Sequence, residues 1–253
     1  MTREYIHSET DDHILIITID RPEARNAFNK DMALQMEAIV DRFEEDDQLW
    51  VAIIRGEGQS FSAGQDLKGE SAVAKRRGGF GIMGTPPKKP VIAAIDGYAL
   101  AGGMELTLSC DLIVATTTSQ FGLMEVKRGL LAVGGGCFRL PRRVPYHVAM
   151  DMILTGEMKT AEEMKHFGLV NRLAEPGKAL EVAMELAGII CANSPVAVQA
   201  AKEVAGRSAA ELWKDAEGWA NQGEAFLRIQ KSEDLREGLT AFAEKRDPVW
   251  KGR

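Results

Sequence analysis

The sequence predicts an α/β fold, in which buried and largely parallel strands alternate with helices and a stretch of helices alone follows. Three observations lead to this prediction. Short apolar runs end at turn residues, the segments between them carry the apolar spacing of amphipathic helices, and strand signals fade in the second half of the chain. With 253 residues, 45% of them apolar and 27% charged, the chain suits one sizeable globular domain with a small appended one.

Four runs predict strands. Each is short and rich in Ile, Val, Leu or Ala, and each is followed by turn-forming or small polar residues such as Arg21-Pro22 or Asp96-Gly97. Because the runs are continuously apolar rather than alternating, both faces of the sheet should be covered. The predicted strands are His13–Asp20, Val51–Arg55, Val91–Ile95 and Leu112–Ala115.

The first predicted helix follows Asn29, a residue type that caps helix N-termini. Behind it, Met36, Ile39, Val40 and Phe43 recur at the spacing of one buried helix face. Another helix should follow the strand at Val91 after a tight turn and run through Cys110. The later predicted helices are Tyr146–Thr155, Thr160–Phe167, Lys178–Ala192, Val196–Ala205, Ala209–Ile229 and Ser232–Lys245.

A domain boundary is predicted near Asn193-Ser194-Pro195, because proline restricts the backbone of the residue before it. Residues 1–194 would form the core and residues 195–253 a helical region. A helical region of this size cannot bury all of its apolar faces alone, among them Leu235, Leu239 and Phe242. We therefore expect it to pack on the core, on another subunit, or on both.

Charge and composition argue against several classes of protein. The formal net charge of -6 makes a general attraction to nucleic acid unexpected. No apolar run approaches the ~20 residues of a membrane helix, and the polar N-terminal segment does not look like a targeting peptide, so we expect a cytoplasmic protein without membrane contact. Three scattered cysteines, Cys110, Cys137 and Cys191, form no C-x-x-C pair, so no metal site or disulfide framework is predicted.

One segment departs from the overall charge. Between Ser71 and Pro90 there is no acidic residue, and the basic residues are Lys75, Arg76, Arg77, Lys88 and Lys89. Two interpretations are open: a solvated surface loop, or a mobile basic cover over an anionic ligand.

Two glycine-containing stretches follow predicted strands, Phe61–Lys68 and Asp96–Leu106. In the second, small residues join a strand to a helix, where a ligand can approach the backbone and free amides can stabilise an anion. A plain turn with glycine for packing is the alternative.

Two carboxylates add to this pattern. Glu105 and Glu125 both lie in otherwise apolar runs, MELTLSC and FGLMEV. A carboxylate in such a setting is costly unless it is paired or used. Two of them near a candidate oxyanion site make an acid/base pair.

The sequence resembles the crotonase, or enoyl-CoA hydratase, superfamily. FSAGQDL, VIAAIDGYALAGGMEL, SCDLIVA, QFGLMEVKRGL and LTGEMKTAEEMKHFGLVNRL occur in the family's order. The resemblance extends from RPEARNAF near the start to AFAEKRDPVWKGR at the end, and this last run is similar to that of carnitinyl-CoA dehydratases.

The resemblance implies a crotonase-like spiral of ββα repeats with a C-terminal helical region that forms homotrimers, often paired into hexamers. It implies a coenzyme A thioester as ligand. It places catalytic glutamates at Glu105 and Glu125 and oxyanion-hole amides at Gln65 and Gly102. We expect coenzyme A to contact Arg25, Ala63, Gln65, Asp66, Leu67 and Lys68, together with Lys245 from a neighbouring chain.

Three departures from the family pattern concern the substrate more than the reaction. Gln65 stands where hydratases usually have alanine, Met124 replaces a proline before the second glutamate, and Leu131–Gly136 replaces a turn that usually contains proline.

The expected reaction is addition of water to a trans-2-enoyl-CoA, giving a 3-hydroxyacyl-CoA, and its reverse. Glu105, kept ionised by the helix dipole, would act as base toward water, and Glu125 would deliver the proton at C2. No metal or redox cofactor is expected. The alternatives are a carnitinyl-CoA dehydratase, an enoyl-CoA isomerase, and a CoA-thioester-binding protein without turnover.

Overall fold

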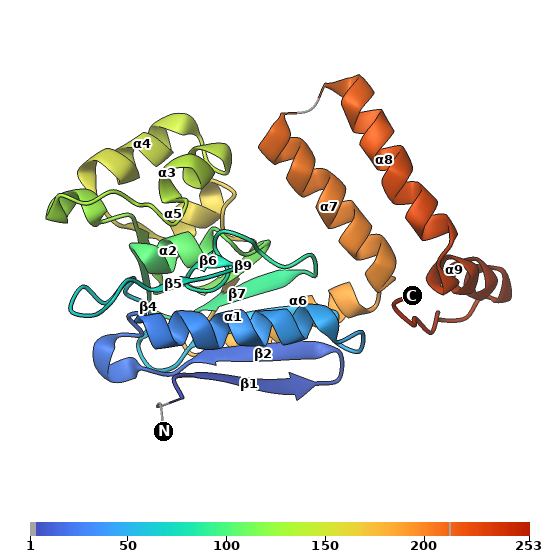
Figure 1. Cartoon of the computed structure of the whole chain (residues 1–253), viewed down its shortest axis with the longest axis horizontal. Helices are drawn as coiled ribbons and strands as arrows, with labels where there is room; N and C mark the ends of the chain where they lie inside the picture. The colour runs from blue at the N-terminus through green and yellow to red at the C-terminus, as the bar shows by residue number, and fades with distance from the viewer. Residues whose placement is uncertain (1–3, 213) are drawn as a thin grey trace.

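The computed structural model describes residues 4–212 and 214–253 (Figure 1). Its centre is a six-stranded sheet in the order β1-β2-β3-β7-β9-β12, parallel except for the β1–β2 hairpin. The four strands that the sequence predicts are confirmed as β2, β3, β7 and β9. The strands are β1 (Ile6–Asp11), β2 (Ile14–Ile19), β3 (Val51–Gly56), β7 (Val91–Ile95), β9 (Leu112–Thr116) and β12 (Arg172–Ala174).

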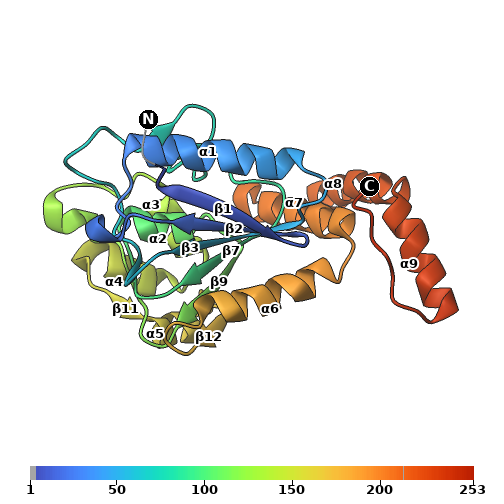
Figure 2. The same cartoon turned by 90° about the horizontal axis from the view of Figure 1, so that it is seen from below.

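Both faces of this sheet are covered, which explains the continuous apolar runs. Along β2, Leu15 and Ile17 belong to the core cluster that includes helix α1 (Lys30–Glu45), whereas Ile14 and Ile16 pack with helix α6 (Ala179–Cys191). Figure 2 shows α1 and α6 on opposite sides of the sheet. Successive side chains of a strand point to opposite faces, so a strand between two helices must be apolar throughout.

Helix α1 forms as predicted. The side chain of Asn29 accepts a hydrogen bond from the Met32 N–H at 3.0 Å and caps the helix. Met36, Ile39, Val40 and Phe43 are all buried against the sheet, so the spacing of apolar residues is confirmed as one core-facing stripe.

A second sheet lies beside the first and was not predicted. Its order is β11-β10-β8-β4. Three times along the chain, a strand of the large sheet is followed by one of the small sheet: β3 by β4, β7 by β8 and β9 by β10. With the intervening helices this is the predicted spiral of ββα repeats. The small strands are β4 (Ser60–Ser62), β8 (Tyr98–Leu100), β10 (Gln120–Gly122) and β11 (Lys159–Thr160).

Short helices follow the strands of the small sheet. Helix α2 ends at Thr107 instead of running through Cys110, because the N–H groups of Ser109 and Cys110 bond three residues back and tighten the chain into a turn. The others are η2 (Glu125–Arg128), α3 (Gly136–Arg139), η3 (Leu140–Arg142), α4 (Tyr146–Thr155) and α5 (Ala161–His166), with α2 at Gly102–Thr107 and η1 at Pro22–Ala24.

The last three helices extend away from the two sheets (Figure 1). They are α7 (Pro195–Glu211), α8 (Asp215–Gln230) and α9 (Glu233–Glu244). The predicted break between Ala205 and Ala209 is wrong: Gly206 lies inside α7, and the helix ends at Leu212, which adopts φ 53°. Leu239 and Phe242 of α9 are 64% and 86% exposed in a single chain.

The basic segment follows neither interpretation fully. Arg77 is buried and pairs with Asp41 and Glu44 of α1. Lys89 is buried and donates to two carbonyl groups at the end of the same helix, those of Phe43 and Asp46. The segment is therefore fastened to α1 by charge, and it includes the short hairpin β5 (Val73–Ala74) and β6 (Gly78–Gly79).

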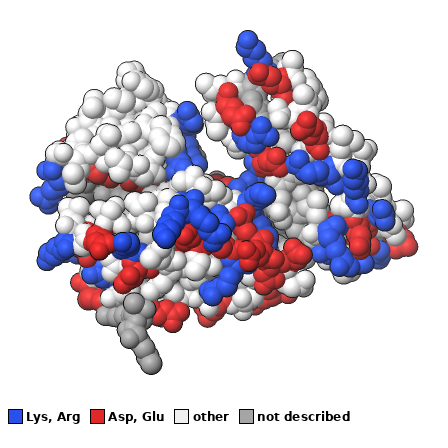
Figure 3. All heavy atoms as spheres, viewed as in Figure 1, with Lys and Arg blue, Asp and Glu red and all other residues white. Residues whose placement is uncertain are grey.

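A groove of about 1060 Å³ separates the lobe around α3 from helix α7 (Figure 3). Its lining includes Lys88, Arg142, Arg143, Lys202 and Arg207. The Lys202 ammonium crosses to the core, pairing with Asp111 at 2.6 Å. In the described part of the chain no single helix is long and apolar enough to cross a membrane; α6 and α7 reach that length only together, with a bend of 104° between them.

Candidate active site

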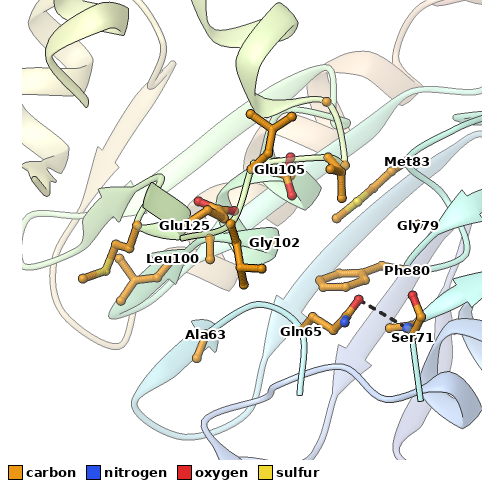
Figure 4. Close-up of a pocket in the computed structure, with 18 of the residues that line it drawn as sticks. Ala63, Gln65, Ser71, Gly79, Phe80, Met83, Leu100, Gly102, Glu105 and Glu125 are labelled. Atoms are coloured by element: carbon orange, nitrogen blue, oxygen red, sulfur yellow. Dashed lines mark hydrogen bonds between the residues drawn. The ribbon is translucent and has the colours of Figure 1, made fainter. Parts of the chain in front are cut away.

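A cavity of about 950 Å³ opens where the strands of the small sheet end (Figure 4). β4, β8 and β10 pair in parallel, so their carboxyl ends meet at one edge of the sheet. The segments that follow them supply Gln65, Gly102 and Glu125 to the cavity wall, although these residues lie far apart in the sequence.

The amide of Gln65 faces away from its neighbouring segment. Gln65 forms a parallel bridge with Phe28, in which Phe28 donates to the Gly64 carbonyl and accepts from the Asp66 N–H, both at 2.8 Å. The bonds of such a bridge come from the two flanking residues, so the Gln65 N–H points to the other side. The Gln65 side-chain oxygen accepts a long hydrogen bond of 3.4 Å from the Ala72 N–H.

A second amide lies beside it. Gly102 is the first residue of α2, and the N–H of that position has no acceptor within the helix. Gly64 adopts φ +99°, and a Cβ there would lie 2.9 Å from the Gly102 nitrogen. Glycine at position 64 therefore lets the two segments approach without an intervening side chain, and both Gln65 and Gly102 line the cavity.

Glu105 lies one turn further along α2 and is 4% exposed. The N–H of Gly136 donates to its Oε1 at 2.9 Å. Burial raises the pKa of the Glu105 carboxyl from 4.5 to about 7, a rise that Glu125 increases and that the Gly136 amide and Arg139 oppose. The sequence predicts that the helix dipole favours the ionised form of Glu105, whereas burial, the largest cause of the pKa shift, acts in the opposite direction.

Glu125 begins the 3₁₀ helix η2, directly after β10. Its Oε2 is buried and has no hydrogen-bond partner among the described residues. Burial raises the pKa of this carboxyl as well. Figure 4 shows Glu105 and Glu125 on the same side of the cavity, close to Gly102, so the structure brings together the two acids that the sequence singles out.

The other predicted contact residues separate into two groups. Arg25, Ala63 and Leu67 line the cavity with Gln65. Asp66 instead pairs with Arg21 at 2.8 Å, and Lys68 is exposed outside the lining. Lys245 directly follows helix α9, which Figure 1 shows on the opposite side of the molecule from α2. Its predicted contact with a neighbouring chain stays a prediction.

Several lining residues were not predicted. Phe80 and Met83 come from the segment after Ser71, and Phe138 and Arg139 from helix α3. Phe80 has φ 51° and stacks on Phe28, with 4.2 Å between the ring centroids. Two exposed cations of the lining, Lys127 and Arg128, follow Glu125 after one residue, Val126, and this closeness in the sequence was the available signal for them. Among the described residues no three His, Cys, Asp or Glu side chains gather as a metal site would require.

Residues 9–253 match the family model described as enoyl-CoA hydratase/isomerase. The chain belongs to this family. The resemblance to the crotonase superfamily is thereby confirmed, and this enoyl-CoA hydratase/isomerase family member carries its two acids in the cavity described above.

Known relatives agree over the full length. A carnitinyl-CoA dehydratase of Escherichia coli (strain K12) is 38% identical over 260 residues, which cover 99% of each chain. A solved enoyl-CoA hydratase from Mycobacterium tuberculosis H37Rv is 48% identical, with a TM-score of 0.95 over 98% of this chain and 99% of that one. A probable enoyl-CoA hydratase/isomerase from Mycobacterium abscessus is 49% identical, with a TM-score of 0.94 over 100% of both chains. This family member is therefore an enzyme, a hydro-lyase.

The raised pKa of Glu105 predicts a pH-dependent cost in stability. Because folding raises this pKa, the contribution of the protonated carboxyl is complete below about pH 4.5 and is lost as the pH rises through about 7. A glutamine side chain cannot ionise, so the Glu105→Gln variant avoids the cost of a buried charge. Its free energy of unfolding should be higher than that of the wild type by about 2–3 kcal/mol at pH 8, and only slightly higher at pH 5. Urea unfolding at a fixed protein concentration measures both, with the exposed Glu162→Gln as control. An equal difference at the two pH values would contradict the assignment.

Proposed function

We propose that this chain is an enoyl-CoA hydratase, which adds water reversibly to a trans-2-enoyl-CoA to give a 3-hydroxyacyl-CoA. One observation carries the proposal: two carboxyl groups with buried oxygens, Glu105 and Glu125, share a cavity with two outward-facing backbone amides, those of Gln65 and Gly102. Hydration needs this combination, because negative charge must be held on the thioester oxygen while one proton leaves water and another reaches C2.

The amides would hold the thioester carbonyl. As the water oxygen attacks C3, charge moves to the carbonyl oxygen and an enolate forms. Preplaced N–H donors stabilise that charge, each by about 3 kcal/mol in comparable sites. The close approach of Gly64 to Gly102 leaves room for the carbonyl where a side chain would intrude.

The two acids would move the protons. The water oxygen bonds to C3 while Glu105 takes one of its protons, and Glu125 gives its proton to C2 as the double bond is lost. A pKa of about 7 suits Glu105 for accepting a proton near neutral pH. The unpartnered Oε2 of Glu125 suits a proton that is handed to substrate. Proton exchange then restores both groups, and the step needs no metal or redox cofactor.

Coenzyme A would enter along the exposed cations of the cavity. Its phosphate groups are anionic, and Arg25, Lys127 and Arg128 are exposed members of the lining. Ala63, Gln65 and Leu67 belong to the same lining, and the Ala63 N–H donates to the Arg25 carbonyl at 3.0 Å. Asp66 and Lys68, which lie in the same segment, stay predicted contacts.

The acyl compartment favours a neutral acyl chain over the carnitinyl alternative. Among the described lining residues the only acids are Glu105 and Glu125, and the lining also includes the cation Arg139 close to Glu105. A quaternary ammonium group at the acyl end would meet this guanidinium and no further carboxylate. Carnitinyl-CoA dehydration still stands as the second candidate, because the Escherichia coli enzyme of that name is 38% identical over 99% of both chains. Double-bond isomerisation and binding without turnover are the remaining alternatives.

We also propose a homotrimer, alone or paired into a hexamer. On the described part of α8 and α9, exposed apolar side chains include Trp219, Phe226, Leu239 and Phe242. A single chain leaves this surface open to water, and a neighbouring copy would cover it. Such a neighbour would also give Lys245 its predicted access to another chain's ligand.

A panel of thioesters with product identification tests the reaction. Trans-2-enoyl-CoA substrates should yield 3-hydroxyacyl-CoA, with carnitinyl-CoA and 3-enoyl-CoA as the competing arms. Glu105→Gln and Glu125→Gln keep the side-chain shape, so each should lower turnover at least ~100-fold while thioester affinity changes little. Faster turnover of carnitinyl-CoA would favour the second candidate, and binding without turnover of any thioester would refute the enzymatic proposal.

The cations of the cavity should affect binding more than chemistry. Arg25→Gln and Arg128→Gln should each raise KM ~3- to 10-fold and leave kcat within ~2-fold, since phosphate contacts are equal in ground and transition states. The effect should shrink with added salt. Lys178→Gln, at an exposed lysine outside the lining and outside the predicted contacts, is the control and should leave KM unchanged. Steady-state kinetics at low and high salt decides, and a fall in kcat at unchanged KM would contradict the assignment.

Light scattering on the full chain tests the assembly. We expect the mass of a trimer or hexamer at micromolar concentration. Phe242→Asp places a charge on the exposed face of α9 and should shift the population toward smaller species without loss of helical circular dichroism. A monomeric wild-type chain would refute both the assembly and the shared role of Lys245.

A further inference from the structure

Arg139 connects three segments around the buried carboxyl group of Glu105, and it takes no part in the proton transfers proposed above. It is the last residue of α3 and lines the cavity. Its Nη1 donates to the Ser109 hydroxyl at 2.9 Å and to the Gly134 carbonyl at 3.1 Å, and its Nη2 donates to the Met83 carbonyl at 2.6 Å. One guanidinium thus connects the end of α2, the Gly134–Gly136 turn and the segment after Ser71.

The Gly134–Gly136 turn is the part that holds Glu105. Its last amide, Gly136 N–H, donates to the Glu105 Oε1. A Cβ at Gly134 would lie 2.8 Å from the Glu105 Oε2, and a Cβ at Gly135 would lie 2.7 Å from the Arg139 Nη1. The turn therefore fills the space between the guanidinium and the carboxyl without room for a side chain.

We propose that Arg139 is a positioning residue for Glu105: by holding the Gly134–Gly136 turn and Met83 against α2, it keeps the Gly136 amide on the carboxyl and so keeps the base aimed at water. This inference rests on the proposed function. Arg139 does not need to touch the reacting atoms, because it acts through the turn.

Charge gives the inference a second, separable consequence. The ionisable groups near the Glu105 carboxyl are Glu125 on η2 and Arg139 and Cys137 on α3. Those near Arg139 are Glu105, Arg143 and Cys110. Arg139 is the cation that lowers the pKa of Glu105 against burial, so removing it should raise that pKa further and leave less of the base ionised at neutral pH.

The experiment compares Arg139→Gln, Arg139→Lys and the matched control Arg142→Gln. Arg142 is exposed, and its guanidinium lies 5.9 Å from the Phe138 ring, compared with 5.2 Å for Arg139. Unlike Arg139, which donates to the Gly134 carbonyl, Arg142 is not a residue of the cavity lining. We expect Arg139→Gln to lower kcat at least ~10-fold with KM within ~3-fold, and to move the acid limb of the kcat/KM profile to higher pH by ~0.5–1 unit. Arg139→Lys keeps the positive charge but loses the planar guanidinium that donates to several acceptors at once. It should therefore lower kcat while the acid limb of the kcat/KM profile stays nearly unmoved.

A double-mutant cycle separates positioning from general damage. If Arg139 acts through Glu105, Arg139→Gln should cost little further rate in a Glu105→Gln background. An equal loss in both backgrounds, or an unmoved acid limb in Arg139→Gln, would overturn the inference. Should Arg139→Gln fail to fold, Arg139→Lys decides, because wild-type kcat in that variant would also overturn it. Full turnover in Glu105→Gln alone would instead refute the proposed function.

Discussion

The site depends on the burial of one carboxyl group, that of Glu105. Desolvation raises its pKa to about 7, which turns an ordinary acid into a group that exchanges protons near neutrality. Burial on this scale is tolerable only if the ionised form has polar neighbours. The Gly136 amide and the Arg139 guanidinium are those neighbours, and the glycines at 134 and 135 leave the space that lets them approach. Glycine at positions 134 and 135 of the turn before α3 is thus explained by the close packing of the turn between the Glu105 carboxyl and Arg139.

Close backbone contact also determines the geometry around Gly102, at the start of α2. A Cβ at Gly103 would lie 2.1 Å from the Ser62 carbonyl, and one at Gly102 would lie 2.6 Å from the Phe80 ring. The start of α2 therefore packs directly on β4 with no side chain between. This packing brings the first amide of α2 beside the Gln65 segment. The spiral supplies the frame, because parallel strands of three residues each end at one level and release their loops on one side.

How much of this the sequence could predict depends on how local each signal is. The inner strands β2, β3, β7 and β9 of the large sheet are covered on both faces, so their continuous apolar runs can be recognised from the sequence alone. The edge strands β1 and β12 were not predicted, because most of their residues are not buried. Glu105 and Glu125 were visible for the opposite reason, as charges in apolar runs. The strands of the small sheet could not be predicted, because three residues are too few to show an alternating pattern and their pairing depends on neighbouring strands. The role of Arg139 could not be predicted either, because its hydrogen bond to Met83 joins positions 56 residues apart. The raised pKa of Glu105 was not predicted, because burial is a property of the whole fold, whereas the helix dipole can be inferred locally.

The charges of the cavity suit the ligand of the proposed function. The lining holds three exposed cations, Arg25, Lys127 and Arg128, which are available to phosphates, and two acids with buried carboxyl oxygens. Arg139, near Glu105, is held by the carbonyl groups of Gly134 and Met83. The proposed thioester would have an anionic handle, a polarisable carbonyl next to the amides, and an acyl end that carries no positive charge. Because Arg139 is held in place by the same turn that holds Glu105, it cannot move aside for a cation without disturbing the base. Under the proposed function, discrimination at the acyl end and positioning of the base are therefore parts of one physical constraint.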